Sequence, residues 1–223
     1  MINIVKTQPA PPCLEIEKLK KNGNYNCEDV FERIVTDFHC KCYICEDKET
    51  SIEIEHFEPH KDTNIDLKFD WNNLFYACGH CNNLKGTRFS NILKCTDPNH
   101  RIVDFIRFEM DILANNYPEI TALEDDEKTH NTVALIQEVY AGRTKHKSQE
   151  AIFIRKRLSE EMRVFSMNVL EYFDKNIGSN KKADLRELII YALLPNSPFT
   201  AFKIWFVKSK PRILTEFGEF LPQ

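Results

Sequence analysis

The spacing of hydrophobic and polar residues divides the chain into three regions. Residues 1–39 form an arm broken by prolines and then a predicted helix over residues 29–38, where apolar side chains recur at helical spacing. Residues 40–99 hold two short alternating runs, SIEIEHF and WNNLFYA, which predict strands. Residues 100–223 are predicted to be mainly helical, as in NTVALIQEVY and ADLRELIIYALL. The pattern predicts an α+β protein that is mostly helical around a small β-containing unit.

Composition narrows the class of protein further. The chain has 223 residues, of which 42% are hydrophobic and 29% charged. A chain of this length and composition can form one ordered hydrophobic core, alone or with a small module held together by a metal ion. The first residues contain no apolar run suited to a signal peptide, and no apolar run reaches membrane-spanning length. We therefore expect a cytoplasmic protein without membrane contact. In that reducing compartment, eight cysteines favour metal ligation or free thiols over disulfides.

Two pairs of cysteines give the strongest chemical signal, Cys42 with Cys45 and Cys78 with Cys81. A gap of two residues lets both sulfurs of a pair turn toward one ion, and four thiolates together suit tetrahedral Zn²⁺. Such a site is closed, so the zinc would hold loops together rather than perform chemistry. The alternatives are a redox dithiol or unrelated buried cysteines, and each explains one pair but not both.

The other cysteines lack this spacing. Cys40 and His80 lie near the two pairs in the sequence as spare ligands. Cys13, Cys27 and Cys95 have no partner at ligand spacing, and we interpret them as small buried hydrophobic residues.

The segment IEIEHFEPH, between the two cysteine pairs, brings Glu55 next to His56, with His60 four residues further on. Cleavage of a phosphodiester bond needs a base that activates water and a cation that neutralises the phosphate. Because adjacent residues of a regular strand point to opposite faces, Glu55 and His56 reach one centre only at a strand end, twist or bulge. In a regular strand we would retain His56 and not Glu55, with His60 as a reserve ligand or a solvated loop residue.

The order Cys-x-x-Cys, Glu-His-Phe-x-Pro, Trp-x-Asn-Leu, Cys-x-x-Cys-Asn-x-x-Lys resembles the zinc-containing branch of the HNH endonucleases, whose catalytic unit is a ββα-metal fold. This resemblance implies that His56 is the general base, that Asn73 orients the site and that Lys85 steadies the phosphate. It also implies that Glu55 and Asn82 bind a catalytic divalent ion. Asn82 stands where many relatives have histidine, which favours a harder ion such as Mg²⁺ or Mn²⁺. Residues 40–99 would form this core, between the N-terminal arm and helix and the C-terminal helical region.

The whole chain resembles PtuB, the HNH subunit of Septu and of some retron-associated anti-phage systems. This likeness implies an effector that hydrolyses DNA, or alternatively RNA, together with a PtuA-like ABC-type ATPase. In the retron systems, a reverse transcriptase with its RNA and DNA would be a further partner. Residues 1–17 and 195–223 are candidate docking surfaces, although the aromatic residues of the second segment are more simply explained by burial in the core.

The net charge of −4 is unexpected for a protein that binds phosphate backbones. Residues 142–163 hold seven Lys or Arg against three Glu, which indicates either a basic stripe or the solvated face of an amphipathic helix. The rival function is a non-catalytic zinc-stapled adaptor that binds a partner protein. That function leaves the ordered set of Glu55, His56, Asn73 and Asn82 unexplained, so we favour the enzyme.

Overall fold

A computed structural model of the chain describes residues 1–48, 52–61, 63–111, 117–142 and 144–222. Helices dominate, and two small antiparallel sheets accompany them, which confirms the predicted α+β class. Along the described residues, no helix combines the length and the apolar character needed to cross a bilayer.

The N-terminal region contains two helices joined by a loop, α1 (Cys13–Lys18) and α2 (Glu28–Asp37). Helix α2 confirms the helix predicted over residues 29–38. Acidic residues occupy its first turn, where the positive end of the helix dipole favours them, and Val30 and Ile34 are fully buried.

The first hairpin pairs β1 (Ile52–His56) with β2 (Leu74–Cys78), in regular antiparallel register from Ile52 opposite Cys78 to His56 opposite Leu74. Strand β2 is buried along its whole length. Helix α4 (Gly79–Lys85) follows β2 directly and packs on both strands. The order of these three elements is the ββα order that the resemblance implies.

Two short helices lie in the connection between β1 and β2, α3 (Ile65–Lys68) and the 3-10 helix η1 (Trp71–Asn73). Asn64 caps the first, and the Asp70 side chain accepts a hydrogen bond from the Asn72 N–H at 2.9 Å in the second. The predicted strand WNNLFYA therefore begins only at Leu74, because the Asp70 cap turns the three preceding residues into helix.

A second hairpin, which the mainly helical prediction for residues 100–223 does not include, follows the short helix α5 (Ile102–Phe105). Its strands are β3 (Ile106–Met110) and β4 (Pro118–Ala122). Ile106 and Phe108 are buried. The alternation that places them on one face spans only one short strand, and pairing with β4 is what makes it stable.

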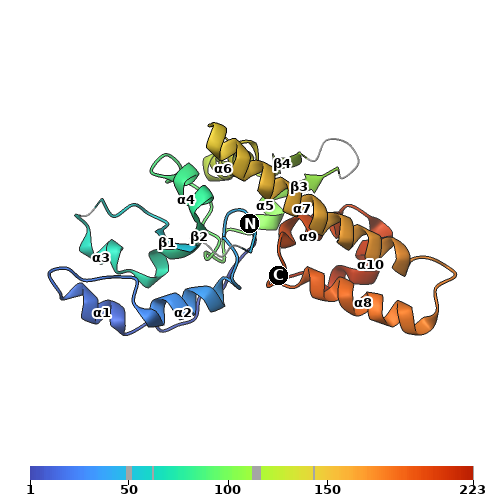
Figure 1. The fold of residues 1–223 in the computed structure, drawn as a ribbon, viewed down its shortest axis with the longest axis horizontal. Helices are drawn as coiled ribbons and strands as arrows, with labels where there is room; N and C mark the ends of the chain where they lie inside the picture. Colours follow the sequence, from blue (N-terminus) through green and yellow to red (C-terminus); the bar gives the residue numbers. More distant parts are fainter. Residues whose placement is uncertain (49–51, 62, 112–116, 143, 223) are drawn as a thin grey trace.

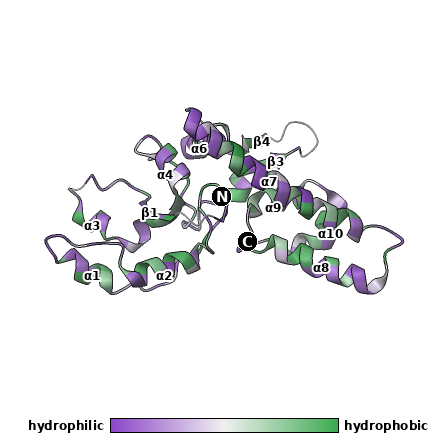
Figure 2. Ribbon diagram, in the orientation of Figure 1, coloured by the Kyte–Doolittle hydropathy of each residue, from purple (hydrophilic) through white to green (hydrophobic). Residues whose placement is uncertain are grey.

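The remainder is helical, as predicted: α6 (Glu127–Ala141), α7 (Lys145–Tyr172), α8 (Ser179–Leu193), α9 (Thr200–Lys208), α10 (Pro211–Phe217) and the 3-10 helix η2 (Gly218–Phe220). Hydrophilic and hydrophobic residues alternate along α7 and α8 (Figure 2), as expected for helices with one buried face. Phe199 and Phe202 are almost completely buried, so these aromatics serve the core rather than a docking surface.

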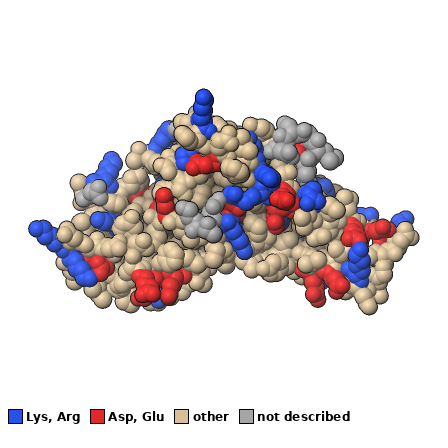
Figure 3. All heavy atoms as spheres, viewed as in Figure 1, with Lys and Arg blue, Asp and Glu red and all other residues tan. Residues whose placement is uncertain are grey.

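The basic segment at residues 142–163 forms mostly the start of α7, where several of its cations have partners within the protein. Arg155 is buried and donates to the Tyr140 carbonyl, and Arg157 pairs with Asp47. On the face shown in Figure 3, basic and acidic side chains are interspersed rather than gathered into one basic surface. This part of α7 therefore resembles an amphipathic helix more than a dedicated basic stripe.

Helices α1 and α3 lie toward one end of the long axis of the molecule and the C-terminal helices α8 and α10 toward the other, with the first hairpin between them (Figure 1). Hydrogen bonds nevertheless join residues 41–46 to the beginning of α9. The Lys41 ammonium donates to the Ser197 carbonyl at 2.7 Å, and the Ala201 N–H donates to the Glu46 carboxylate at 2.9 Å. These residues are buried, so the loop that carries the first cysteine pair is held by the C-terminal region.

Candidate active site and metal centre

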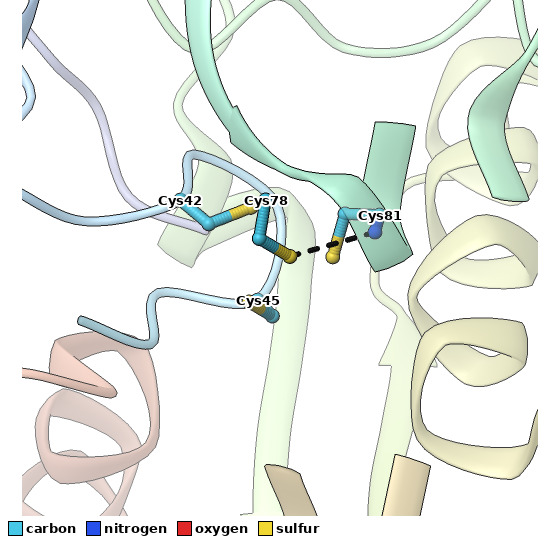
Figure 4. A group of neighbouring side chains, drawn as sticks. All are labelled: Cys42, Cys45, Cys78 and Cys81. Atoms are coloured by element: carbon cyan, nitrogen blue, oxygen red, sulfur yellow. Dashed lines mark hydrogen bonds between the residues drawn. The ribbon is translucent and has the colours of Figure 1, made fainter. Parts of the chain in front are cut away.

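Four cysteine sulfurs gather at the junction of β2 and α4. Cys42 and Cys45 come from the loop before β1, Cys78 ends β2 and Cys81 lies in α4, and all four side chains converge (Figure 4). Their sulfur atoms lie within 4.8 Å of one another and are buried. The Cys81 N–H donates to the Cys78 sulfur at 3.5 Å, so the cluster also caps α4. Four converging thiolates form a donor set that suits a tetrahedral soft or borderline cation.

The spare ligands named from the sequence lie outside this cluster. Cys40 is exposed, and His80 is held by the Glu150 carboxylate at 2.7 Å and the Val139 carbonyl at 2.8 Å. Cys95 is buried as predicted, and burial raises the pKa of its thiol to about 12.

The prediction for Cys13 and Cys27 is wrong. The two residues form a disulfide and are only half-buried, rather than being free, buried thiols. The spacing of the two residues matches no cysteine motif. The loop between α1 and α2 folds back on itself and so brings the two sulfurs together. The expectation that the cysteines avoid disulfides fails for this pair.

A surface cavity lies beside the end of β1 and brings the predicted general base together with the two predicted ligands of the catalytic ion. Its walls include His56 and Glu55 from β1, His60 from the following loop, and Asn82 from α4. Tyr25, from the loop between α1 and α2, completes one wall. Among the predicted site residues, Asn73 and Lys85 lie behind this cavity rather than on its surface, since both are almost fully buried.

The imidazole of His56 is fixed through one of its two nitrogen atoms. Nε2 lies 2.9 Å from the carbonyl oxygen of Lys68. Because a carbonyl oxygen can only accept, Nε2 carries the hydrogen and the lone pair of the neutral ring is on Nδ1. No described residue forms a hydrogen bond with Nδ1. Burial lowers the pKa of His56, which favours the neutral form, and a neutral imidazole with a free Nδ1 can act as a general base.

Glu55 lies on the opposite strand face from His56, because β1 is regular through both residues. Its side chain is 5% exposed, and Oε1 lies 2.5 Å from the Lys85 ammonium. Burial raises the pKa of Glu55 to about 7, while the charge of Lys85 acts in the opposite direction. The second oxygen, Oε2, is buried without a hydrogen-bond partner among the described residues. Regular pairing is the condition under which we would not retain Glu55, although the residue is among those around the cavity.

Lys85 has little access to a bound phosphate. Its side chain is 1% exposed, and besides pairing with Glu55 it donates to the Phe57 carbonyl at 2.8 Å. In this position the ammonium compensates the buried negative charge of Glu55 and fixes the backbone at Phe57, the residue that follows β1.

Asn73 organises the loop after β1 through three backbone contacts. Its amide nitrogen donates to the carbonyls of Glu58 and Leu67 at 2.9 and 3.0 Å, and its oxygen accepts from the Glu58 N–H at 2.7 Å. Leu67 precedes Lys68, whose carbonyl holds His56. Asn73 is thus hydrogen-bonded to the backbone directly before the residue whose carbonyl contacts the imidazole.

Asn82 is half-buried on α4 and donates from Nδ2 to the Glu53 carboxylate at 2.5 Å. Because Nδ2 donates this hydrogen bond, Oδ1 is the atom of Asn82 that can bind a metal ion. Glu55 and Asn82 both belong to the cavity beside His56. A pair of oxygen donors of this kind fits a hard divalent cation.

Sequence reasoning missed three contributors to the site, namely Tyr25, the Lys68 carbonyl and Glu53. The sequence could have indicated Glu53, because the alternation of IEIE places it on the same strand face as Glu55. No local pattern indicates the other two, because each reaches His56 through the folding of a loop.

Residues 42–88 match the family model for HNH endonucleases. The matched segment contains both cysteine pairs, the first hairpin and α4, and this agreement supports the assignment of the region to the HNH family and suggests a nuclease. No curated protein and no solved structure matches the chain.

Proposed function

We propose that the chain is a metal-dependent HNH endonuclease that hydrolyses phosphodiester bonds in DNA, with RNA as the alternative substrate. One observation supports this function most directly. His56 lines a surface cavity, its Nε2–H is held by a backbone carbonyl, and its Nδ1 has no hydrogen-bond partner among the described residues. A non-catalytic adaptor has no need for an imidazole oriented in this way.

The residues of the cavity divide the reaction between them. Nδ1 of His56 takes a proton from a water molecule, whose oxygen then attacks the phosphorus, and the Lys68 carbonyl keeps the ring in the required tautomer. Glu55 and Asn82 would hold Mg²⁺ or Mn²⁺, which when bound neutralises phosphate charge and stabilises the leaving oxygen. Lys85 and Asn73 act behind the cavity, the first by balancing the charge of Glu55 and the second by fixing the loop of Lys68.

In this proposal Zn²⁺ occupies the four-cysteine cluster and is structural. The four thiolates leave no open position for substrate, and their burial excludes water from the ion. The ion would connect the loop before β1 to the start of α4, and thereby keep the two sides of the hairpin in place.

We further propose a cytoplasmic effector of anti-phage defence that works with a PtuA-like ABC-type ATPase, as the likeness to PtuB implies. A retron reverse transcriptase with its nucleic acids is the further partner in some systems of that kind. The net charge of −4 and the interspersed surface charges support recruitment by a partner, because long-range attraction to a polyanion is weak for such a protein.

The test compares the wild type with His56→Ala and with His146→Ala, a matched change of an exposed histidine on α7. Plasmid DNA and total RNA are incubated with Mg²⁺, Mn²⁺ or EDTA, with and without the ATPase, and zinc content is measured for each protein. We expect His56→Ala to lose about a hundred-fold to ten-thousand-fold in cleavage rate while it retains zinc. His146→Ala should cut like the wild type. Equal cleavage by His56→Ala, or a wild type that never cuts, would favour the adaptor.

A further inference from the structure

Tyr25 reaches the catalytic cavity from outside the segment that matches the HNH family. It lies in the loop between α1 and α2, and its ring meets that of His56 in an edge-on contact, with 4.5 Å between ring centroids and 73° between ring planes. His60 packs against the same imidazole, with 4.3 Å between the centroids. The His56 ring is therefore bounded by two aromatic neighbours as well as by the Lys68 carbonyl.

The loop that carries Tyr25 is closely fixed. The Cys13–Cys27 disulfide closes it at its base, and the Asn24 N–H donates to the Glu17 carboxylate at 2.9 Å. Gly23 packs so tightly that a Cβ atom there would lie 1.8 Å from the Glu17 carbonyl oxygen. The position of Tyr25 is therefore set by several constraints of its own loop.

The same N-terminal segment is connected to the other side of the imidazole. Lys18, the last residue of α1, pairs with Asp66 of α3 at 2.8 Å. Lys68 ends α3 and supplies the carbonyl that holds Nε2 of His56. The N-terminal segment closed by the disulfide thus contacts the His56 ring directly through Tyr25. It is also linked by an ion pair to α3, whose last carbonyl accepts from Nε2 of His56.

We propose that Tyr25 is a positioning residue for the nuclease reaction, which packs against His56 so that Nδ1 faces the cavity. The inference rests on the proposed function. The terminal torsion of a histidine side chain is broad, and one hydrogen bond at Nε2 permits the ring to tilt about it. An edge-on aromatic neighbour adds a second constraint, and a well-held base matters because small misplacement of a reacting group slows catalysis severely.

The ring of Tyr25, rather than its hydroxyl, provides this constraint. No described residue forms a hydrogen bond with the Tyr25 hydroxyl, whereas the ring is in contact with the imidazole. Tyr25→Phe should therefore keep the function that Tyr25→Ala loses. Tyr191→Ala is a matched control, since Tyr191 lies on α8 and is 58% exposed.

The experiment measures kcat and KM for cleavage under the conditions in which the wild type cuts. We expect Tyr25→Ala to lower kcat between about ten-fold and about a hundred-fold with KM unchanged, while Tyr25→Phe and Tyr191→Ala match the wild type. Zinc content and melting temperature should be equal for all four proteins. Wild-type kcat in Tyr25→Ala, a change in KM alone, or failure of Tyr25→Phe to restore kcat would each overturn the inference.

A double-mutant cycle tests whether the closed loop acts through Tyr25. We expect the paired change Cys13→Ser and Cys27→Ser to lower kcat in the wild type but to have no further effect in Tyr25→Ala, because both act on one contact. Additive losses would show that the disulfide acts elsewhere and would overturn this part of the inference. An inactive wild type would instead refute the nuclease function itself, so the two failures are distinct.

Discussion

The four-cysteine cluster and the His56 cavity lie on one ββα unit and are built in opposite ways. The cluster is buried, its ligands come from two short motifs, and it offers no place for a substrate. The cavity is open, and the imidazole on its wall is held by the Lys68 carbonyl of α3 and packs against the ring of Tyr25, from the loop between α1 and α2. The ligands of a closed metal site can be recognised from local spacing, whereas an open cavity is recognised only through the distant residues that surround it.

Loss of the cluster should have the largest effect on the protein. In Cys81→Ser, or after removal of the metal by a strong chelator, we expect the first hairpin and α4 to lose their fixed structure, because structural zinc contributes on the order of 10 kcal/mol to folding. Circular dichroism, zinc content and cleavage should decline together, in contrast to His56→Ala, which should lose cleavage alone. A folded and active Cys81→Ser would show that the cluster does not hold the unit together. Cys40→Ser, a change at an exposed cysteine, is the control.

The Glu55–Lys85 pair lies between the two sites and should give the next largest effect. Lys85→Met leaves the buried carboxylate without its partner, and we expect a loss of about 3–5 kcal/mol in the free energy of unfolding, measured by denaturant titration. Adding Glu55→Gln removes the uncompensated charge and should restore most of that stability. Because Glu55 is proposed to bind the catalytic ion, the restored double variant should still fail to cut. Full cleavage by that variant would limit Glu55 to a structural role.

Lys6 provides the smallest and most specific effect, a dependence of stability on pH. It is buried, donates to the Leu74 carbonyl at 2.7 Å, and packs over the Trp71 ring, with 3.6 Å from its ammonium to the ring centroid. Burial lowers its pKa from 10.5 to about 7. Between these two values the unfolded chain holds a proton that the folded chain has released, so this group makes stability rise with pH across that window.

Comparison with Lys6→Met isolates this contribution. We expect the wild type to gain up to about 1.4 kcal/mol per pH unit relative to the variant as the pH rises from near 7. Denaturant titrations at several pH values measure the difference. Parallel stability curves for the two proteins would show that Lys6 stays charged when folded.

Features that depend on local spacing could be predicted from the sequence, and features that depend on contacts between distant segments could not. The cysteine pairs and the strands β1 and β2 were predictable, because each depends on residue types at fixed spacing. The choice of His56 and Asn82 came instead from the resemblance to the HNH endonucleases, and the structure places both residues beside one cavity. The disulfide between Cys13 and Cys27 and the contact of Tyr25 with His56 were not predictable, because they depend on how loops fold back.

The second hairpin shows the same limit. Its strands alternate over only a few residues, and short alternation is recognisable as a strand only when the pairing partner is known. The burial of Lys85 is a further example. A charged residue on a helix is expected to be exposed, and only the structure shows that Lys85 is buried against its partner Glu55.

The hydrogen bonds that Lys41 donates to Ser197 and that Glu46 accepts from Ala201 make the metal loop depend on a segment that is synthesised much later than the loop itself. The loop of the first cysteine pair leaves the ribosome before residues 197–201 have been made, so Lys41 and Glu46 then lack two of their partners in the folded chain. A nascent chain that already contains His56 and both cysteine pairs would therefore still lack contacts that hold its metal loop. The region that matches the HNH family would therefore reach its final structure only after residues 197–201 have been added to the chain.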